Sequence, residues 1–271
     1  GVLVAILVRL MPGSTRIITA LQRIKFFEPR INLVFNEYKL KNSKIALKKR
    51  FLKNFDNLEV KKLSFSYPSS NLILKNVSFK IKKKTISCIV GKNGSGKSTF
   101  INIILGLLEP KSGEILYNKI NLNKVIPNIS YVPQNVSLID DSIKNNIIFG
   151  NDKKKFNKNN FIKAIKSTDL FGFIKTLPNK ENTIIGEKGA RISGGQAQKI
   201  GLARSIYSDS EIIMIDEFDN NLDIKSTEKI IKLLSVMKKN KTIIVITHNQ
   251  KYLKYFDNVF NIDNKKITQI K

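Results

Sequence analysis

One short run of glycines followed by a lysine and a serine has the composition and spacing of a phosphate-binding loop. The run reads Gly91-Lys92-Asn93-Gly94-Ser95-Gly96-Lys97-Ser98 and fits the pattern G-x-x-x-x-G-K-[ST]. The glycines let successive backbone N–H groups curl around phosphate oxygens. A helix expected from Ser98 to Leu108 points its N-terminus at the same anion. Lys97 can reach the outer phosphates, the Ser98 hydroxyl can bind Mg²⁺, and Thr99 adds a further hydroxyl.

A pair of carboxylates ends a second apolar run, Ile212–Ile215, which is typical of a buried strand. Alone, an apolar run that ends in Asp-Glu is common and usually has no catalytic role. Downstream of a phosphate loop, the same pair predicts a hydrolytic site. Asp216 then holds Mg²⁺, directly or through water, and Glu217 orients and polarises the attacking water as a general base.

A Ser-Gly-Gly-Gln turn gives the chain a second candidate anion site. The turn, Ser193-Gly194-Gly195-Gln196, opens a helix expected from Ala197 to Tyr207, and a helix N-terminus favours bound phosphate. One nucleotide needs only one phosphate loop. The second element therefore suggests a site that is completed by another subunit.

These three elements, in this order, resemble the nucleotide-binding domain of ABC (ATP-binding cassette) transporters, from about Leu58 to the C-terminus. In that family two domains pair head to tail, and each ATP lies between the phosphate loop of one and the signature turn of the other. The usual signature is Leu-Ser-Gly-Gly-Gln, and this chain has Ile192 in place of the leucine. The resemblance implies ATP and Mg²⁺ as cofactors, and ATP hydrolysis as the activity. It also implies an α/β fold: a P-loop NTPase core with an N-terminal antiparallel β subdomain and an inserted α-helical signature subdomain.

Further landmarks of the family stand in register along the chain. Tyr67 matches the aromatic residue that stacks on adenine. The run Tyr131–Gln134 resembles the Q-loop, in which Gln134 would help to ligate Mg²⁺ and would sense the membrane domain. Asn220-Asn221-Leu222-Asp223 resembles the D-loop, usually Ser-Ala-Leu-Asp, and departs from it at the first two positions.

His248, the only histidine of the chain, directly follows the strand expected at Thr242–Thr247. It matches the family's switch histidine, which contacts the γ-phosphate. The resemblance thus implies that Lys97, Glu217 and His248 are catalytic and that Ser98, Gln134 and Asp216 hold the metal. The implied nucleotide-binding residues are Tyr67, Gly91, Asn93, Gly94, Ser95, Gly96, Lys97, Ser98, Thr99, Gln134, Ser193, Gly194, Gly195, Gln196 and Asp223.

The first 50 residues differ from the rest of the chain. An apolar start leads into a basic stretch with apolar residues at helical spacing, interrupted at Pro12 and Gly13, which we expect to kink or break a helix. This order fits the cytoplasmic exit of a membrane helix; a plain amphipathic helix fits it too. We therefore expect the end of a last transmembrane helix and a linker at 1–50. The ATP-binding domain is expected at 51–271, with its helical subdomain at about 138–200. Because the chain begins with glycine, we expect it to be cut from a longer protein.

Two segments favour an exporter among ABC proteins. Residues 137–147 resemble the exporter segment with a Thr-Ile-Arg-Glu-Asn-Ile core, and residues 185–189 resemble the Val-Gly-Glu-Arg-Gly loop. The resemblance implies a motor domain at the cytoplasmic face of a bacterial inner membrane, paired with a second copy and joined to a transmembrane domain of the same chain. Arg9–Pro12, with Arg16-Ile17 and 140–143, most resembles flippases of lipid-linked oligosaccharides. Lipid A flippases, peptide exporters and multidrug exporters stay open.

The charge balance raises an alternative function. The formal net charge is +27 over 271 residues, which suits a partner such as nucleic acid. However, only seven of the 48 basic residues are arginine, and lysine is scattered through every segment, which indicates compositional drift. We therefore expect no nucleic-acid partner and keep a soluble ABC-type ATPase acting on nucleic acid or ribosomes as the alternative. The single cysteine, Cys88, excludes a disulfide within the chain and is expected in the core.

Overall fold

The computed structural model describes residues 1–39, 50–52, 54–68, 70–151, 156–186, 189–219 and 223–271. The chain divides into two compact units, Gly1–Leu47 and Lys48–Lys271. In the first unit, helix α1 (Val2–Lys39) continues through Pro12 and Pro29, so the expected interruption does not occur. Each proline removes one backbone hydrogen bond, and the bonds of the flanking turns suffice to carry the helix on.

Apolar side chains of α1 lie in the open. Ile17, Ile24 and Ile31 are between 62% and 66% exposed. Among the described residues, none of the helices combines the length and apolar character that crossing a bilayer requires.

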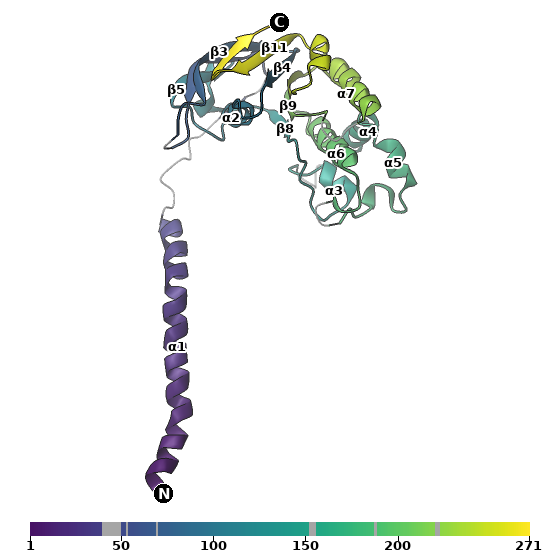
Figure 1. Ribbon diagram of the computed structural model, residues 1–271. Coiled ribbons are helices and arrows are strands. Elements are labelled where there is room, and N and C mark those ends of the chain that lie inside the picture. Colours follow the sequence, from purple (N-terminus) through teal and green to yellow (C-terminus); the bar gives the residue numbers. More distant parts are fainter. Residues whose placement is uncertain (40–49, 53, 69, 152–155, 187–188, 220–222) are drawn as a thin grey trace. The chain divides into compact units, whose positions relative to one another are not determined.

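A six-stranded sheet forms the centre of the second unit (Figure 1). Its order is β12-β11-β4-β10-β9-β8, and all neighbours are parallel except β11 and β12. The strands are β4 (Ile86–Gly91), β8 (Ile129–Val132), β9 (Ile212–Asp216), β10 (Thr242–Ile246), β11 (Asn258–Asp263) and β12 (Lys266–Gln269). The central strands are apolar and β-branched because helices or a second sheet cover both faces.

A four-stranded antiparallel sheet, in the order β3-β2-β5-β6, stands beside the parallel one. Its strands are β2 (Asn57–Phe65), β3 (Leu74–Lys82), β5 (Ser112–Tyr117) and β6 (Ile120–Asn121). Leu58, Val60 and Leu63 on β2 are buried, whereas Lys61 and Lys62 are exposed, as expected for a sheet with one wet face. A short parallel pair joins β1 (Arg50–Phe51) to β7 (Val125–Ile126).

The side chains of β9 alternate between two apolar cores. Ile212 and Met214 pack into a cluster that also holds residues of the antiparallel sheet and of helix α2 (Lys97–Ile104). Ile213 and Ile215 pack on the opposite face against helix α7 (Ile224–Met237). The period of two along one buried strand thus builds a layered α/β core.

A third core holds the helical subdomain. Its helices are α3 (Ile143–Ile147), α4 (Lys158–Ser167), α5 (Phe171–Thr176) and α6 (Gly194–Tyr207). In Figure 1 these four helices lie together at one end of the second unit. The expected α/β class is confirmed. Helix α2 ends four residues before the predicted Leu108, because Gly106 takes a left-handed φ of 75° that stops it.

Candidate functional site

The phosphate loop lies between β4 and α2, at the carboxyl end of the central sheet. Gly94 and Gly96 have φ values of 76° and 102°, which side chains with a Cβ rarely adopt. A Cβ on Gly96 would lie 2.8 Å from Cγ2 of Ile73, whereas one on Gly94 would meet nothing within 4 Å. The Nζ of Lys97 donates to the carbonyl oxygens of Gly91 and Lys92 at 2.9 and 3.0 Å, which closes the loop around its own lysine.

The loop fits a bound phosphate. The hydroxyl oxygen of Ser95 is buried and has no hydrogen-bond partner among the described residues, and a buried polar atom without a partner is costly. A hollow of about 740 Å³ opens beside the loop and is lined by Gly94, Lys97 and Ser98, but not by Ser95. The open space above Gly94, the ammonium group of Lys97 and the N-terminus of α2 together suit an anion.

The same hollow gathers residues that the sequence places far apart. Its lining comprises Gly91, Lys92, Asn93, Gly94, Lys97, Ser98, Gln134, Asp216, Glu217 and His248. Strand β10 pairs with both β4 and β9, so the three strand ends that carry the phosphate loop, the carboxylates and the histidine meet at one edge. The catalytic residues and metal ligands expected from the sequence therefore share one cavity.

Glu217 stands at the centre of a polar cluster. The Nε2 of Gln134 donates to Oε2 of Glu217 at 2.6 Å, and Nδ1 of His248 lies 3.9 Å from Oε1. Glu217 itself has a left-handed φ of 48°, which is uncommon for a residue with a side chain. The turn after β9 thus aims this carboxylate at the loop and at the histidine.

Asp216 lies next to Glu217 and is half-buried. Its Oδ2 accepts a hydrogen bond from the hydroxyl of Tyr131 at 3.2 Å. Burial holds the pKa of the Asp216 carboxyl above its ordinary value, while the bond from Tyr131 acts in the opposite direction. The oxygen atoms of Ser98, Gln134 and Asp216 are the hard ligands that Mg²⁺ prefers, so the donor set fits that ion.

Tyr67 stands close to the loop but not in the lining of the hollow. Its hydroxyl lies 3.4 Å from Oγ1 of Thr99, and its ring, 41% exposed, packs edge-on against Phe65. An exposed aromatic face beside the loop is available for stacking.

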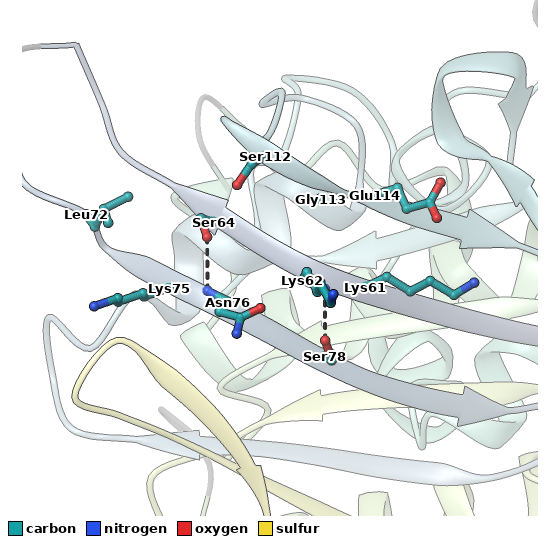
Figure 2. Close-up of a pocket in the computed structure, with 10 residues that line it drawn as sticks. All are labelled: Lys61, Lys62, Ser64, Leu72, Lys75, Asn76, Ser78, Ser112, Gly113 and Glu114. Atoms are coloured by element: carbon teal, nitrogen blue, oxygen red, sulfur yellow. Dashed lines mark hydrogen bonds between the residues drawn. The ribbon is translucent and has the colours of Figure 1, made fainter.

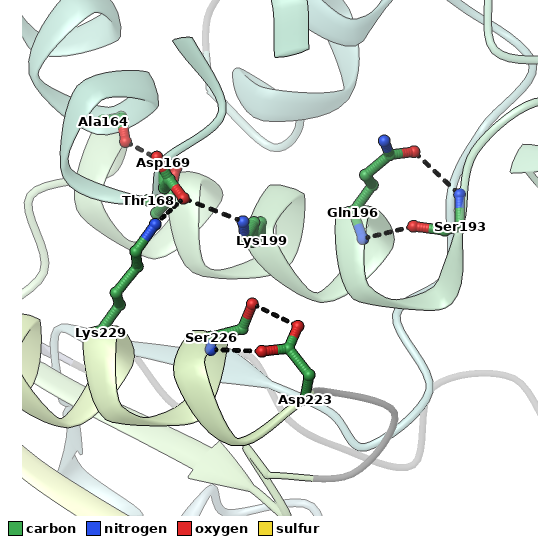
Figure 3. A network of polar contacts seen from close by, with 9 residues as sticks. All are labelled: Ala164, Thr168, Asp169, Ser193, Gln196, Lys199, Asp223, Ser226 and Lys229. Atoms are coloured by element: carbon green, nitrogen blue, oxygen red, sulfur yellow. Dashed lines mark hydrogen bonds and ion pairs between the residues drawn. The ribbon is translucent and has the colours of Figure 1, made fainter. Parts of the chain in front are cut away.

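The signature turn and Asp223 are not part of this hollow. Ser193 and Gln196 form a reciprocal capping box at the start of α6, and Asp223 caps α7 through Ser226 (Figure 3). Ser193 and Asp223 therefore each accept one backbone N–H in the first turn of their own helix. The D-loop positions 220–222, and 187–188 of the exporter loop, lie outside the described residues.

Two residues with a place at the site were not identified from the sequence. One is Tyr131, whose contact with Asp216 depends on strand pairing. The other is Asp219, which accepts hydrogen bonds from Oγ1 of Thr247 at 3.0 and 3.1 Å, next to His248. Neither residue belongs to a spacing pattern that marks a site residue in the sequence. Only their position in the sequence, close to the predicted site residues, could have suggested them.

A larger hollow, of about 900 Å³, lies over the antiparallel sheet (Figure 2). Lysines and serines line it, and two of the serines accept backbone N–H groups: Ser64 from Asn76 and Ser78 from Lys62. None of the residues predicted to act in catalysis lines this surface. Its serines serve the irregular pairing of β2 with β3, and it is not the reaction site.

The arrangement in the smaller hollow defines a class of protein. The site combines a phosphate loop with its lysine after β4, a histidine after the neighbouring strand β10, and an aspartate and a glutamate at the end of the next strand, β9. These are the parts of a P-loop nucleoside triphosphatase. A family model described as ABC transporter matches residues 74–220, which is more than half of the chain. The chain belongs to the ABC transporter family, binds ATP and is an ATP hydrolase by class.

Several curated proteins are similar to this chain. An export ATP-binding/permease protein of Rickettsia bellii is 40% identical over 217 residues, which cover 78% of this chain and 37% of that protein. An export ATP-binding/permease protein of Rickettsia typhi is 36% identical over 256 residues, which cover 92% of this chain and 42% of that protein. An ATP-dependent lipid A-core flippase of Haemophilus influenzae is 35% identical over 218 residues, with 78% and 37% covered. The chain thus spans about two fifths of the length of these relatives.

A solved structure with the same fold is that of a bacterial Atm1-family ABC exporter with ATP bound. It matches with a TM-score of 0.77 and 25% identity, over 84% of this chain and 40% of that one.

Proposed function

We propose that this chain is the motor domain of an ABC exporter and that it couples ATP hydrolysis to transport across a bacterial inner membrane. The observation that carries the proposal is the convergence of Lys97, Gln134, Asp216, Glu217 and His248 on one hollow beside the phosphate loop. The names of the relatives supply the class of process, since they are export proteins and flippases.

In the proposed reaction, Lys97 and the N–H groups of the loop bind the phosphates and compensate their charge. Ser98, Gln134 and Asp216 hold Mg²⁺, which supplies further positive charge when bound. Glu217 positions a water in line with the γ-phosphate, and His248 lies on the opposite side of that carboxylate from Gln134.

We further propose that a second copy completes the site. Ser193, Gly194, Gly195 and Gln196 line no part of the hollow that holds the phosphate loop, so their helix N-terminus is available to a nucleotide on another copy. Asp223, at the start of α7, is proposed to lie near the same interface. ATP then holds two domains together, and its hydrolysis releases them.

The membrane partner and the substrate are proposed from helix α1 and from the flippase relatives. The basic, apolar and exposed helix α1 suits the cytoplasmic end of a transmembrane helix of the same protein. The flippase relatives favour a lipid, a lipid-linked oligosaccharide or another hydrophobic molecule as substrate. The domain would work at the cytoplasmic face of the membrane.

Replacing the general base tests the hydrolytic part. Glu217→Gln should slow steady-state phosphate release from ATP by at least roughly 10²-fold, because the amide cannot accept a proton from water. The ATP dissociation constant, measured by equilibrium binding, should stay close to that of the unchanged chain. Glu228→Gln, an exposed position on α7, is the matched control and should keep full turnover. Turnover by Glu217→Gln equal to that of the control would remove Glu217 from this role.

A further inference from the structure

Tyr131 reaches the metal-binding aspartate from the neighbouring strand. In the parallel pair β8–β9, Tyr131 lies opposite Met214, so Asp216 is two residues further along β9 on the same face of the sheet. A tyrosine ring is long enough to span that step, and its hydroxyl meets Oδ2 of Asp216 at 3.2 Å. The ring is rigid, so this contact fixes the direction of the carboxylate with little loss of side-chain freedom.

Two groups compete for Asp216. The charge of Lys97 attracts the carboxylate from the side of the phosphate loop, while Tyr131 holds it from the side of β8. Lys97 donates to the carbonyls of Gly91 and Lys92, so its ammonium group lies within the loop. Without the tyrosine hydroxyl, Asp216 would lose this hydrogen bond, while the attraction of Lys97 would remain.

We propose that Tyr131 is a positioning residue of the magnesium site, which presents Asp216 to the metal by holding Oδ2 and leaving Oδ1 to the ion or its water. This inference rests on the proposed function. The Oδ1 atom has no hydrogen bond to any residue that the structure describes.

The test is Tyr131→Phe, which removes one oxygen atom and keeps the ring. In the full chain, we would follow the binding of a fluorescent ATP analogue while free Mg²⁺ is titrated. The variant should need roughly tenfold to a hundredfold more Mg²⁺ for the half-maximal change, which is the effect of losing a hydrogen bond to a charged group. In EDTA its affinity for the same analogue should match that of the unchanged chain. A merely structural role would lower both affinities together.

The matched control is Tyr255→Phe, at an exposed tyrosine outside the hollow. It should leave the magnesium titration unchanged. An unchanged or tighter magnesium response in Tyr131→Phe would overturn the proposal, as would an equal loss of affinity in EDTA. If the unchanged chain bound no ATP analogue at all, the proposed function would fail first, and the result would differ from a failure confined to Tyr131.

Discussion

The hydroxyl of Thr247 fixes the backbone on both sides of His248. Thr247 is fully buried at the end of β10, donates to the carboxylate of Asp219 and accepts the backbone N–H of Asn249 at 3.0 Å. The histidine between Thr247 and Asn249 is thereby held at the mouth of the hollow, 3.9 Å from Glu217. Asp219 does not line the hollow, and we expect it to act on the site through this threonine.

Asp219→Ala should therefore lower kcat roughly tenfold, because a small misplacement of a catalytic group is costly, while the ATP dissociation constant changes less than about twofold. Steady-state hydrolysis and equilibrium binding measure the two quantities. Asp56→Ala removes only a surface ion pair with Lys83 and serves as the control. If Asp219→Ala kept the kcat of the unchanged chain, Thr247 would hold the backbone around His248 without the carboxylate of Asp219.

At the residue scale, the sequence was informative where spacing carries the chemistry. Lys97, Ser98, Asp216, Glu217 and His248 were identified from short patterns, and the structure brings them into one hollow. Tyr131 and Asp219 act through contacts between strands, and such contacts depend on register. No pattern in a single chain encodes that register.

Helix α6 shows how packing overrides helix propensity. Gly201 lies in the middle of this helix, where glycine costs about 1 kcal/mol relative to alanine. A Cβ there would lie 2.7 Å from Cγ2 of Val136 and 3.2 Å from Cγ1 of Val132. The glycine lets α6 approach β8 and the segment that follows it, and so sets where the signature turn stands relative to the core.

Gly201→Ala should lower the free energy of unfolding by up to about 2 kcal/mol, since the steric cost of overpacking, about 1–3 kcal/mol, offsets or exceeds the gain of about 1 kcal/mol in helix propensity. Gly172→Ala on α5 is the matched control, because a Cβ there meets nothing within 4 Å. It should raise the same free energy by up to about 1 kcal/mol. Urea denaturation measures the free energy of unfolding of both variants. If Gly201→Ala raised it, the side chains of Val132 and Val136 would have moved aside at little cost.

At the element scale, the buried strands were the easiest to predict. The apolar runs Ile212–Ile215 and Thr242–Thr247 predicted β9 and β10 to within one residue of the observed ends. Helix ends were harder, since α2 stops at the left-handed turn of Gly106 and α1 passes through two prolines. Each outcome depends on the backbone conformation at a particular residue. The spacing of apolar residues in the sequence does not reveal that conformation.

At the scale of the whole molecule, the described residues of the second unit form three apolar cores. The phosphate loop and Glu217 border one hollow, whereas Ser193 and the turn it caps lie at the start of α6 and do not line it. In the proposed pairing, a single chain presents two parts of a nucleotide site without joining them. The prediction that another subunit completes the site is tested by the experiment below.

The proposal that a second copy completes the site is tested most directly by the oligomeric state of the Glu217→Gln chain. We would measure it by sedimentation equilibrium with Mg²⁺ and ATP, with Mg²⁺ and ADP, and without nucleotide. Because this variant hydrolyses ATP slowly, ATP should stay bound, so we predict a dimer with ATP and a monomer in the other two conditions. Ser193→Arg, which puts bulk and positive charge at the signature turn, should return the ATP sample to monomers. Bound ATP without any nucleotide-dependent pairing would contradict the proposal that a second copy completes the site.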